Sequence, residues 1–294
     1  MEYSVFKLDF STGVHFGKGM LNDSMETFTA DMLFSALYIE ALKLGKHNDF
    51  YQAVETGRLL FSDAFPFIGK QYMLPKPVIY VEHSDQGDSE KKKRFKAMKY
   101  LPVEKLDLYL SGNMDLKDNP MEDFGTFEQR AAAFVRKSGE TLPYQVGVFH
   151  YKNGNGLYIL TAYESKEELR LFELLMDALS YSGIGGKKAE GLGKFTLRYG
   201  TGTNILIQHL NNRTGRFLLL SSALPRDDEL EQSLVGASYM LSKHSGFVTS
   251  DQYADEARRK KDLYLFDAGS CFCHKFDGDI YDVSEGGNHA VYRY

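Results

Sequence analysis

The segment from Gly183 to Gly193, GIGGKKAEGLG, most constrains how this chain folds, because five of its eleven residues are glycine. Glycine takes positive φ at little steric cost and lets a backbone lie close against a ligand. Successive backbone N–H groups in such a loop form an anion-binding concavity. The segment therefore predicts either a phosphate-binding loop or a tight helix-to-strand connector. Its candidate phosphate-binding residues are Gly183, Gly185, Gly186, Lys187, Lys188, Gly191 and Gly193, with Lys194 directly after.

Two common nucleotide-binding loops are excluded by spacing. A P-loop needs a glycine five residues before the G-K pair, where Tyr181 stands, and the Rossmann fingerprint fails at Lys188. Both of those loops also run from a strand into a helix N-terminus, whose dipole favours phosphate. This loop instead leaves a predicted helix and enters a predicted strand. Phosphate binding here would depend on backbone amides and lysines.

Hydrophobic periodicity predicts two rounds of strand, helix and strand in residues 1–199. Thr29 is a candidate N-cap for the first helix, and Ser165 with Glu168 forms a capping box for the second. Apolar alternation on both sides of the turn KNGNG predicts a hairpin. This order is that of a ferredoxin-like, or RRM-like, domain. The predicted elements are strand 3–10, helix 29–43, short strands within 57–81, hairpin strands 145–151 and 157–163, helix 165–182 and strand 194–199.

The remaining segments complete the predicted α+β fold of tandem ferredoxin-like domains. Residues 82–142 are polar and rich in turn signals, so we expect an inserted arm rather than core. Residues 200–294 predict a second, smaller α+β domain, with strands near 216–225 and 262–276 and a short helix or loop at 227–236. The predicted domains are thus 1–199, carrying the arm and the glycine-rich loop, and 200–294.

Charge and cysteine content limit the classes of function. The chain has 35 basic and 40 acidic residues, a net charge of −5, which disfavours a protein that coats RNA by charge alone. Separate basic and acidic faces would fit a subunit that contacts both RNA and protein. The cysteines, Cys271 and Cys273, with His274 supply too few ligands for a structural zinc, so we expect core cysteines, no metal and no cofactor. Their low number, with no signal peptide or membrane-length apolar run, predicts a cytoplasmic protein without a membrane partner.

Eight segments spread along the chain resemble the RAMP superfamily of CRISPR proteins. The glycine-rich loop before the last strand of a ferredoxin-like domain is typical of that superfamily. The combination with the other segments is more specific and resembles the 5′-handle-capping subunit of type III-A (Csm) effector complexes. The segments are VHFGKG (14–19), FTADMLFSALYIEAL (28–42), YMLPKP (72–77), SGIGGKKAEGLGKF (182–195), FLLLSSALP (217–225), HSGFV (244–248), and AGSCF with GDIYDV near the end.

The resemblance implies a subunit without chemistry of its own. It would hold the 5′ handle of the guide RNA (crRNA) and sit between the large polymerase-like CRISPR subunit and the first backbone RAMP subunit. Two rival hypotheses stay open. The chain could be a RAMP-family endoribonuclease for guide processing or target cleavage, or an assembly adaptor that uses the fold without RNA.

The nuclease hypothesis depends on two candidate catalytic residues, Asp31 and His15. Asp31 lies in the first turn of the first helix, where the resemblance places a catalytic aspartate in sibling backbone subunits. A single carboxylate is weak support for a metal site, and the helix dipole explains an acidic residue there. His15 could act as an acid or base, or it could contact RNA or pack locally, which we favour. The sequence alone does not place His15 and Lys18 beside the glycine-rich loop.

A basic run offers a second candidate RNA surface. Residues 91–96, KKKRFK, followed by Lys99, could track a phosphate backbone, with Phe95 available to stack on a base. The alternative is a solvated arm without a ligand.

Overall fold

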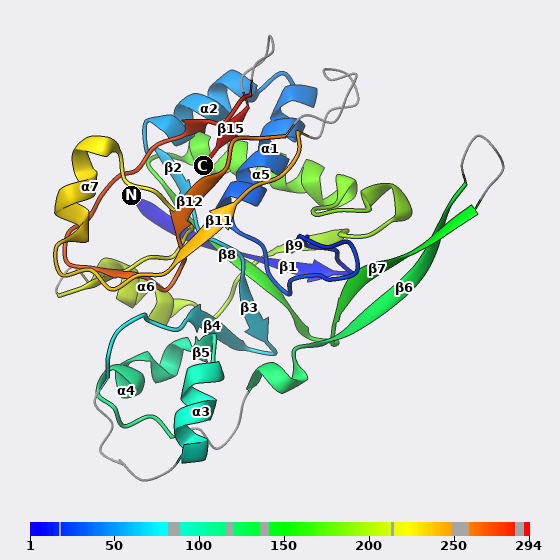
Figure 1. Ribbon diagram of the computed structural model, residues 1–294. Helices are drawn as coiled ribbons and strands as arrows, with labels where there is room; N and C mark the ends of the chain where they lie inside the picture. Colours follow the sequence, from blue (N-terminus) through cyan, green and yellow to red (C-terminus); the bar gives the residue numbers. More distant parts are fainter. Residues whose placement is uncertain are drawn as a thin grey trace.

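The computed structural model describes residues 1–17, 19–81, 89–115, 120–135, 141–212, 215–248, 259–285 and 291–294. In these residues the fold is mixed α/β, and every strand pairing is antiparallel (Figure 1). One seven-stranded sheet lies at the centre, and four two-stranded ribbons accompany it. Within the same ranges, no helix combines the length and apolar character that crossing a bilayer requires.

The central sheet has the order β5-β4-β3-β8-β1-β9, with β2 also beside β8. At one edge of the sheet, β1 pairs with β9 so that Phe10 lies opposite Phe195. The segment that leaves β1 and the glycine-rich segment that enters β9 therefore meet at the same end of the sheet. The strands are β1 (Glu2–Phe10), β2 (Leu59–Phe61), β3 (Phe65–Ile68), β4 (Gln71–Pro75), β5 (Tyr100–Pro102), β8 (Asn155–Tyr163) and β9 (Phe195–Tyr199).

Both faces of this sheet are buried. Alternate side chains of β1 point to opposite faces and therefore enter different cores. Phe6 and Leu8 enter one core, and Val5 enters the other. The first core lies beneath α1 (Ala30–Lys43), α2 (His47–Glu55) and α5 (Lys166–Ser182), which cover one face of the sheet in Figure 1. The second core is closed by β4, β5, α4 (Leu106–Leu110) and α6 (Asn204–Asn211).

The two predicted long helices are confirmed. The Ser165 hydroxyl accepts a hydrogen bond from the Glu167 amide at 3.1 Å, and Glu168 accepts one from the Ser165 amide at 3.0 Å. These bonds form the predicted capping box at the start of α5. Thr29 occupies the N-cap position of α1, but its side chain does not cap the helix.

The hairpin predicted around KNGNG is wrong. Strand β7 (Thr141–Tyr151) pairs along its whole length with β6 (Gly125–Val135), whereas β8 pairs with β1, β2 and β3. Apolar alternation shows that a segment is a half-buried strand but does not name its partner. The β6–β7 hairpin projects away from the body of the protein in Figure 1.

The predicted arm is only partly an arm. Within residues 82–142, Leu101 and Val103 belong to the second core, so this part of the segment is not an excursion from the fold. Helix α3 (Ser89–Ala97) carries the basic run, and its Phe95 packs against the second core. Phe95 is therefore partly buried in the fold. The stretches 82–88, 116–119 and 136–140 lie outside the described residues.

The C-terminal third contains the predicted short helix, α7 (Asp227–Leu234). The strands predicted within 262–276 exist as β12 and β13, but they do not pair with each other. Each takes its partner from earlier in the chain. The ribbons are β10 (Phe217–Leu218) with β13 (Cys271–Phe272), β11 (Leu241–His244) with β12 (Leu263–Phe266), and β14 (Tyr281–Asp282) with β15 (Tyr292–Arg293).

Asp63, between β2 and β3, joins this C-terminal third to the main sheet. Its carboxylate accepts hydrogen bonds from the Ala30 amide (2.7 Å), the Ser222 amide (2.9 Å) and the Ser222 hydroxyl (3.0 Å). Asp63 thus caps α1 from a distant point in the chain, in place of Thr29, and holds the FLLLSSALP segment against it. Burial raises the pKa of Asp63 to about 7, although the hydrogen bonds from Ser222 and Ala30 oppose that rise.

This buried carboxyl predicts a pH-dependent stability. Because the pKa of Asp63 is higher in the folded chain than in the unfolded chain, its contribution is present below about pH 4 and is lost as pH rises through 7. The thermal midpoint should therefore fall between pH 5 and pH 8. Asp63→Asn can keep all three hydrogen bonds and should flatten that fall. Equal pH dependence in the two proteins, measured by circular dichroism, would contradict this assignment.

Candidate nucleic-acid interface

The glycine-rich loop is bonded through its backbone to the segment that follows β1. The Gly193 amide donates to the Gly13 carbonyl at 2.9 Å, and the Gly186 amide donates to the His15 carbonyl at 2.8 Å. These bonds follow from the pairing of β1 with β9, which brings both segments to one end of the sheet. The proximity that the sequence left open is thus present in the fold.

Four of the five glycines have no space for a side chain, two because of the segment after β1 and two because of the loop's own backbone. A Cβ atom on Gly183 would lie 2.8 Å from the Leu192 carbonyl oxygen, and one on Gly185 would lie 2.7 Å from the His15 carbonyl oxygen. A Cβ on Gly186 would meet the His15 ring at 2.6 Å. Gly193 is blocked in the same way by the Ile184 backbone. Gly191 differs, because a Cβ there would meet nothing within 4 Å, although its φ is +85°.

His15 packs locally, as the favoured alternative predicted. Its side chain is only 6% exposed, and Nδ1 lies 2.7 Å from the Gly147 carbonyl oxygen on β7. Gly147 in turn has no space for a side chain, because a Cβ would lie 2.7 Å from the Asp23 backbone. His15 therefore fastens β7 to the β1–α1 segment instead of presenting its ring to solvent. Lys18, which the sequence analysis considered together with His15, lies outside the described residues.

The lysines of the loop differ in how they are engaged. Lys187 donates hydrogen bonds to the Tyr144 hydroxyl at 2.8 Å and to Glu190 at 2.9 Å, and these two bonds raise its pKa. The side chains of Lys188 and Lys194 have no hydrogen bond or ion pair within the part of the chain that the structure describes. Lys194 is exposed and Lys188 is partly exposed, so both ammonium groups remain available to a ligand.

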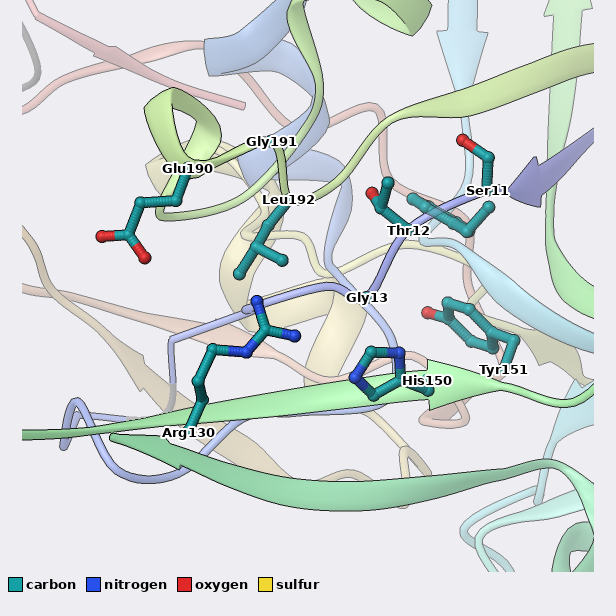
Figure 2. Close-up of a pocket in the computed structure, with 10 residues that line it drawn as sticks. Ser11, Thr12, Gly13, Arg130, His150, Tyr151, Glu190, Gly191 and Leu192 are labelled. Carbon is teal, nitrogen blue, oxygen red and sulfur yellow. The ribbon is translucent and has the colours of Figure 1, made fainter. Parts of the chain in front are cut away.

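A groove of 330 Å³ lies between the glycine-rich loop, the end of β1 and the β6–β7 hairpin. Figure 2 shows Glu190 on one side of this groove and Arg130 with His150 on the other. Phe10 and Tyr151 stack at 5.0 Å along its wall. Arg130 and His150 both lie near Glu128, at 3.3 Å and 3.4 Å. The lining residues are Phe10, Ser11, Thr12, Gly13, Arg130, His150, Tyr151, Glu190, Gly191 and Leu192.

Sequence interpretation missed the hairpin side of this groove. Arg130 and Tyr144 lie in or next to the segment interpreted as an arm, and His150 was assigned to a different hairpin. Residues 125–135, GTFEQRAAAFV, show no regular alternation of apolar and polar side chains, so no local pattern marks them as the partner of β7. The groove combines the open backbone of Gly191, the rings of Phe10 and Tyr151 and the guanidinium of Arg130 with one carboxylate, Glu190. Aromatic rings and a cation are groups with which proteins hold a single nucleic-acid strand.

Asp31 is buried, with 5% of its area accessible. It is bonded to the guanidinium of Arg293, to His244 Nδ1 at 3.0 Å and to the Thr29 hydroxyl. Burial alone would raise the pKa of Asp31, but His244 and Arg293 outweigh it and lower the pKa to about 2. Its charge is therefore neutralised within the protein.

The arrangement of possible metal ligands also bears on catalysis. No group of three His, Cys, Asp or Glu side chains able to hold a metal ion occurs in the described ranges. Cys271 is buried in the C-terminal third, and this burial raises the pKa of its thiol to about 11. Cys273 donates to the Gly236 carbonyl at 3.5 Å.

Solved structures with a similar fold come from CRISPR effector complexes. A chain of the Csm3–Csm4 subcomplex of the type III-A interference complex superposes with a TM-score of 0.64 at 17% identity, covering 100% of this chain and 99% of that one. A chain of the Csm1–Csm4 cassette in complex with pppApA gives a TM-score of 0.60 at 18% identity, covering 99% and 94%. The fold is thus that of a type III-A CRISPR complex subunit.

Sequence relatives give the family. The chain is 37% identical over its full length to a CRISPR system Cms protein Csm4 from Mycobacterium tuberculosis H37Rv, covering 96% of that protein. It is 35% identical to Csm4 from Streptococcus thermophilus over 96% of this chain and 93% of the relative. Residues 212–294 also match the CRISPR Csm4 C-terminal domain. This chain belongs to the Csm4 family.

The geometry of the glycines yields a matched pair of variants. Gly185→Ala and Gly191→Ala each place a side chain at positive φ, which costs about 1–2 kcal/mol. Only Gly185→Ala also forces a methyl group against the His15 carbonyl, so we expect it to cost roughly 1–3 kcal/mol more. Urea unfolding of both variants measures the difference. Equal destabilisation would show that the contact with His15 relaxes freely.

Proposed function

We propose that this protein is a non-catalytic subunit of a type III-A CRISPR effector complex that holds the 5′ handle of the guide RNA. In this role it joins the large polymerase-like subunit to the backbone subunits. The observation that carries the proposal is the full-length relationship to Csm4 proteins at 37% identity. Structures described as Csm3–Csm4 and Csm1–Csm4 assemblies with this fold support both protein partners.

The RNA would follow the groove beside the glycine-rich loop. Gly191 has open space toward this groove, and the side chains of Lys188 and Lys194 are unengaged within the described residues. Ammonium groups of this kind attract phosphates in a salt-dependent way. The other glycines and His15 would contribute by placing the loop. Lys18, the remaining sequence candidate for RNA contact, lies outside the described residues.

The domain organisation that we propose is a tandem of ferredoxin-like units, 1–199 and 200–294. The strand order β3-β8-β1-β9, with α1 and α5 on one face, supports the first unit, because it is the arrangement of a β-α-β-β-α-β motif. The match of residues 212–294 to the Csm4 C-terminal domain supports a separate second unit, whose described strands form two-stranded ribbons and not a four-stranded ferredoxin-like sheet.

The absence of catalysis is proposed from Asp31. A carboxylate that is buried and bonded to both Arg293 and His244 is a poor ligand for a metal ion that must also meet RNA. The alternative, a RAMP-family endoribonuclease, would need this aspartate to be accessible. None of the contacts of Asp31 in this structure favours that alternative.

Binding and cleavage can be separated with the purified chain. We expect it to retain repeat-derived handle RNA in the presence of Mg²⁺ without cutting it, because its groove offers contacts but no accessible metal site. Gel electrophoresis of end-labelled RNA measures both outcomes. Cleavage of the repeat RNA would replace this proposal with the nuclease alternative, and loss of retention would favour a protein-only adaptor.

Asp31→Asn tests the same conclusion in the assembled complex. We expect target-RNA cleavage to be unchanged while the chain loses about 3 kcal/mol of stability, because Arg293 and His244 lose a buried charge partner. Asp49→Asn is the matched control, since its pair with Lys46 is exposed and contributes little. Loss of one cleavage site with assembly intact would make Asp31 catalytic.

A further inference from the structure

Lys187 has an unusual backbone conformation. Its φ of +59° makes it the only residue other than glycine with positive φ in the described ranges. Such a conformation is unfavourable for any residue with a side chain, and it persists only where surrounding contacts hold it. A glycine at position 187 would adopt this conformation at little cost. The contacts of the Lys187 side chain therefore need an explanation.

These contacts all lie within the protein. The Lys187 ammonium donates to the Tyr144 hydroxyl at 2.8 Å and to Glu190 Oε1 at 2.9 Å, and it lies 4.7 Å from the centre of the Tyr144 ring. Its side chain is 22% exposed. A lysine so engaged has little capacity left for a phosphate, because two of its three N–H donors already have partners.

Tyr144 belongs to β7, so the bond joins the glycine-rich loop to the projecting hairpin. Leu192 packs against Val146 and Val148 at the base of the same strand. Tyr144 lies two residues farther along β7 toward the hairpin tip than Val146. The ammonium thus adds a second, more distal attachment to the apolar one. Two attachments at different positions along β7 restrict the direction of the strand more than one attachment does.

The groove proposed for RNA is bounded by these two parts, with Glu190 and Gly191 on the loop side and Arg130 and His150 on the hairpin side. We propose that Lys187 is a positioning residue: its ammonium ties the loop to the hairpin and thereby sets the width of the RNA groove, while Lys188 supplies the phosphate contact. This inference rests on the proposed handle-binding function.

Lys187→Gly is the sharpest variant, because it removes the ammonium and also suits the positive φ, so loss of folding is not expected. Tyr144→Phe keeps the ring and removes the hydroxyl. Lys188→Ala is the matched control, since it deletes the same charge one residue away with no described side-chain partner. The full-length proteins are titrated with single-stranded RNA carrying the repeat-derived 5′ tag across a salt series. Hydrogen–deuterium exchange of residues 141–151 is measured in parallel.

We expect Lys187→Gly to weaken RNA binding about tenfold, equivalent to roughly 1.4 kcal/mol. The salt slope should stay unchanged, and β7 should exchange faster. Tyr144→Phe should act in the same direction with a smaller effect. Lys188→Ala should reduce the slope by about 0.7, the value for one phosphate contact with a single strand, without changing the exchange of β7.

Two results would overturn the positioning role while leaving handle binding intact. One is a Lys187→Gly slope reduced like that of Lys188→Ala with exchange of β7 unchanged, which would make Lys187 a phosphate ligand. The other is wild-type affinity and exchange in Lys187→Gly. If the wild-type protein does not bind the tag RNA at all, the proposed function fails together with the inference.

Discussion

Close backbone contact between the glycine-rich loop and the segment after β1 is the constraint on which the rest of the site depends. Amides of Gly186 and Gly193 bond to carbonyls of His15 and Gly13, and a Cβ on Gly185 or Gly186 would collide with His15. His15 then bonds to β7 and orients the hairpin. The groove depends on these successive contacts, because the segment after β1 holds the glycine-rich loop on one side and β7 on the other.

A second group of interactions organises the start of α1. Asp63 accepts the Ala30 amide, and Asp31 is bonded to Arg293 and His244 from the C-terminal third. Both carboxylates lie at the positive end of a helix dipole, which favours negative charge there. The place where a catalytic aspartate was considered is therefore a structural junction between the two halves of the chain.

Sequence patterns predicted the elements better than their partners. Capping signals at Ser165 and alternation in residues 3–10 are local, so α5 and β1 were found nearly to the residue. The pairing of β7 with β6 was missed, because alternation does not encode which strand lies alongside. The glycine density correctly marked the loop, but the loss of Cβ space to His15 depends on a contact distant in sequence. The Tyr144–Lys187 bond left no sequence signal for the same reason.

The Asp63 carboxylate has a consequence for how relatives of this chain vary. It links the Ala30 amide to Ser222, which lies 159 positions after Asp63 and contributes both its amide and its hydroxyl. Replacing either side chain by an apolar one leaves a buried polar group without its partner, which is costlier than replacing both. Positions 63 and 222 should therefore change together among Csm4 sequences. A joint substitution there would mark lineages in which different side chains make the contact between the two parts of the chain.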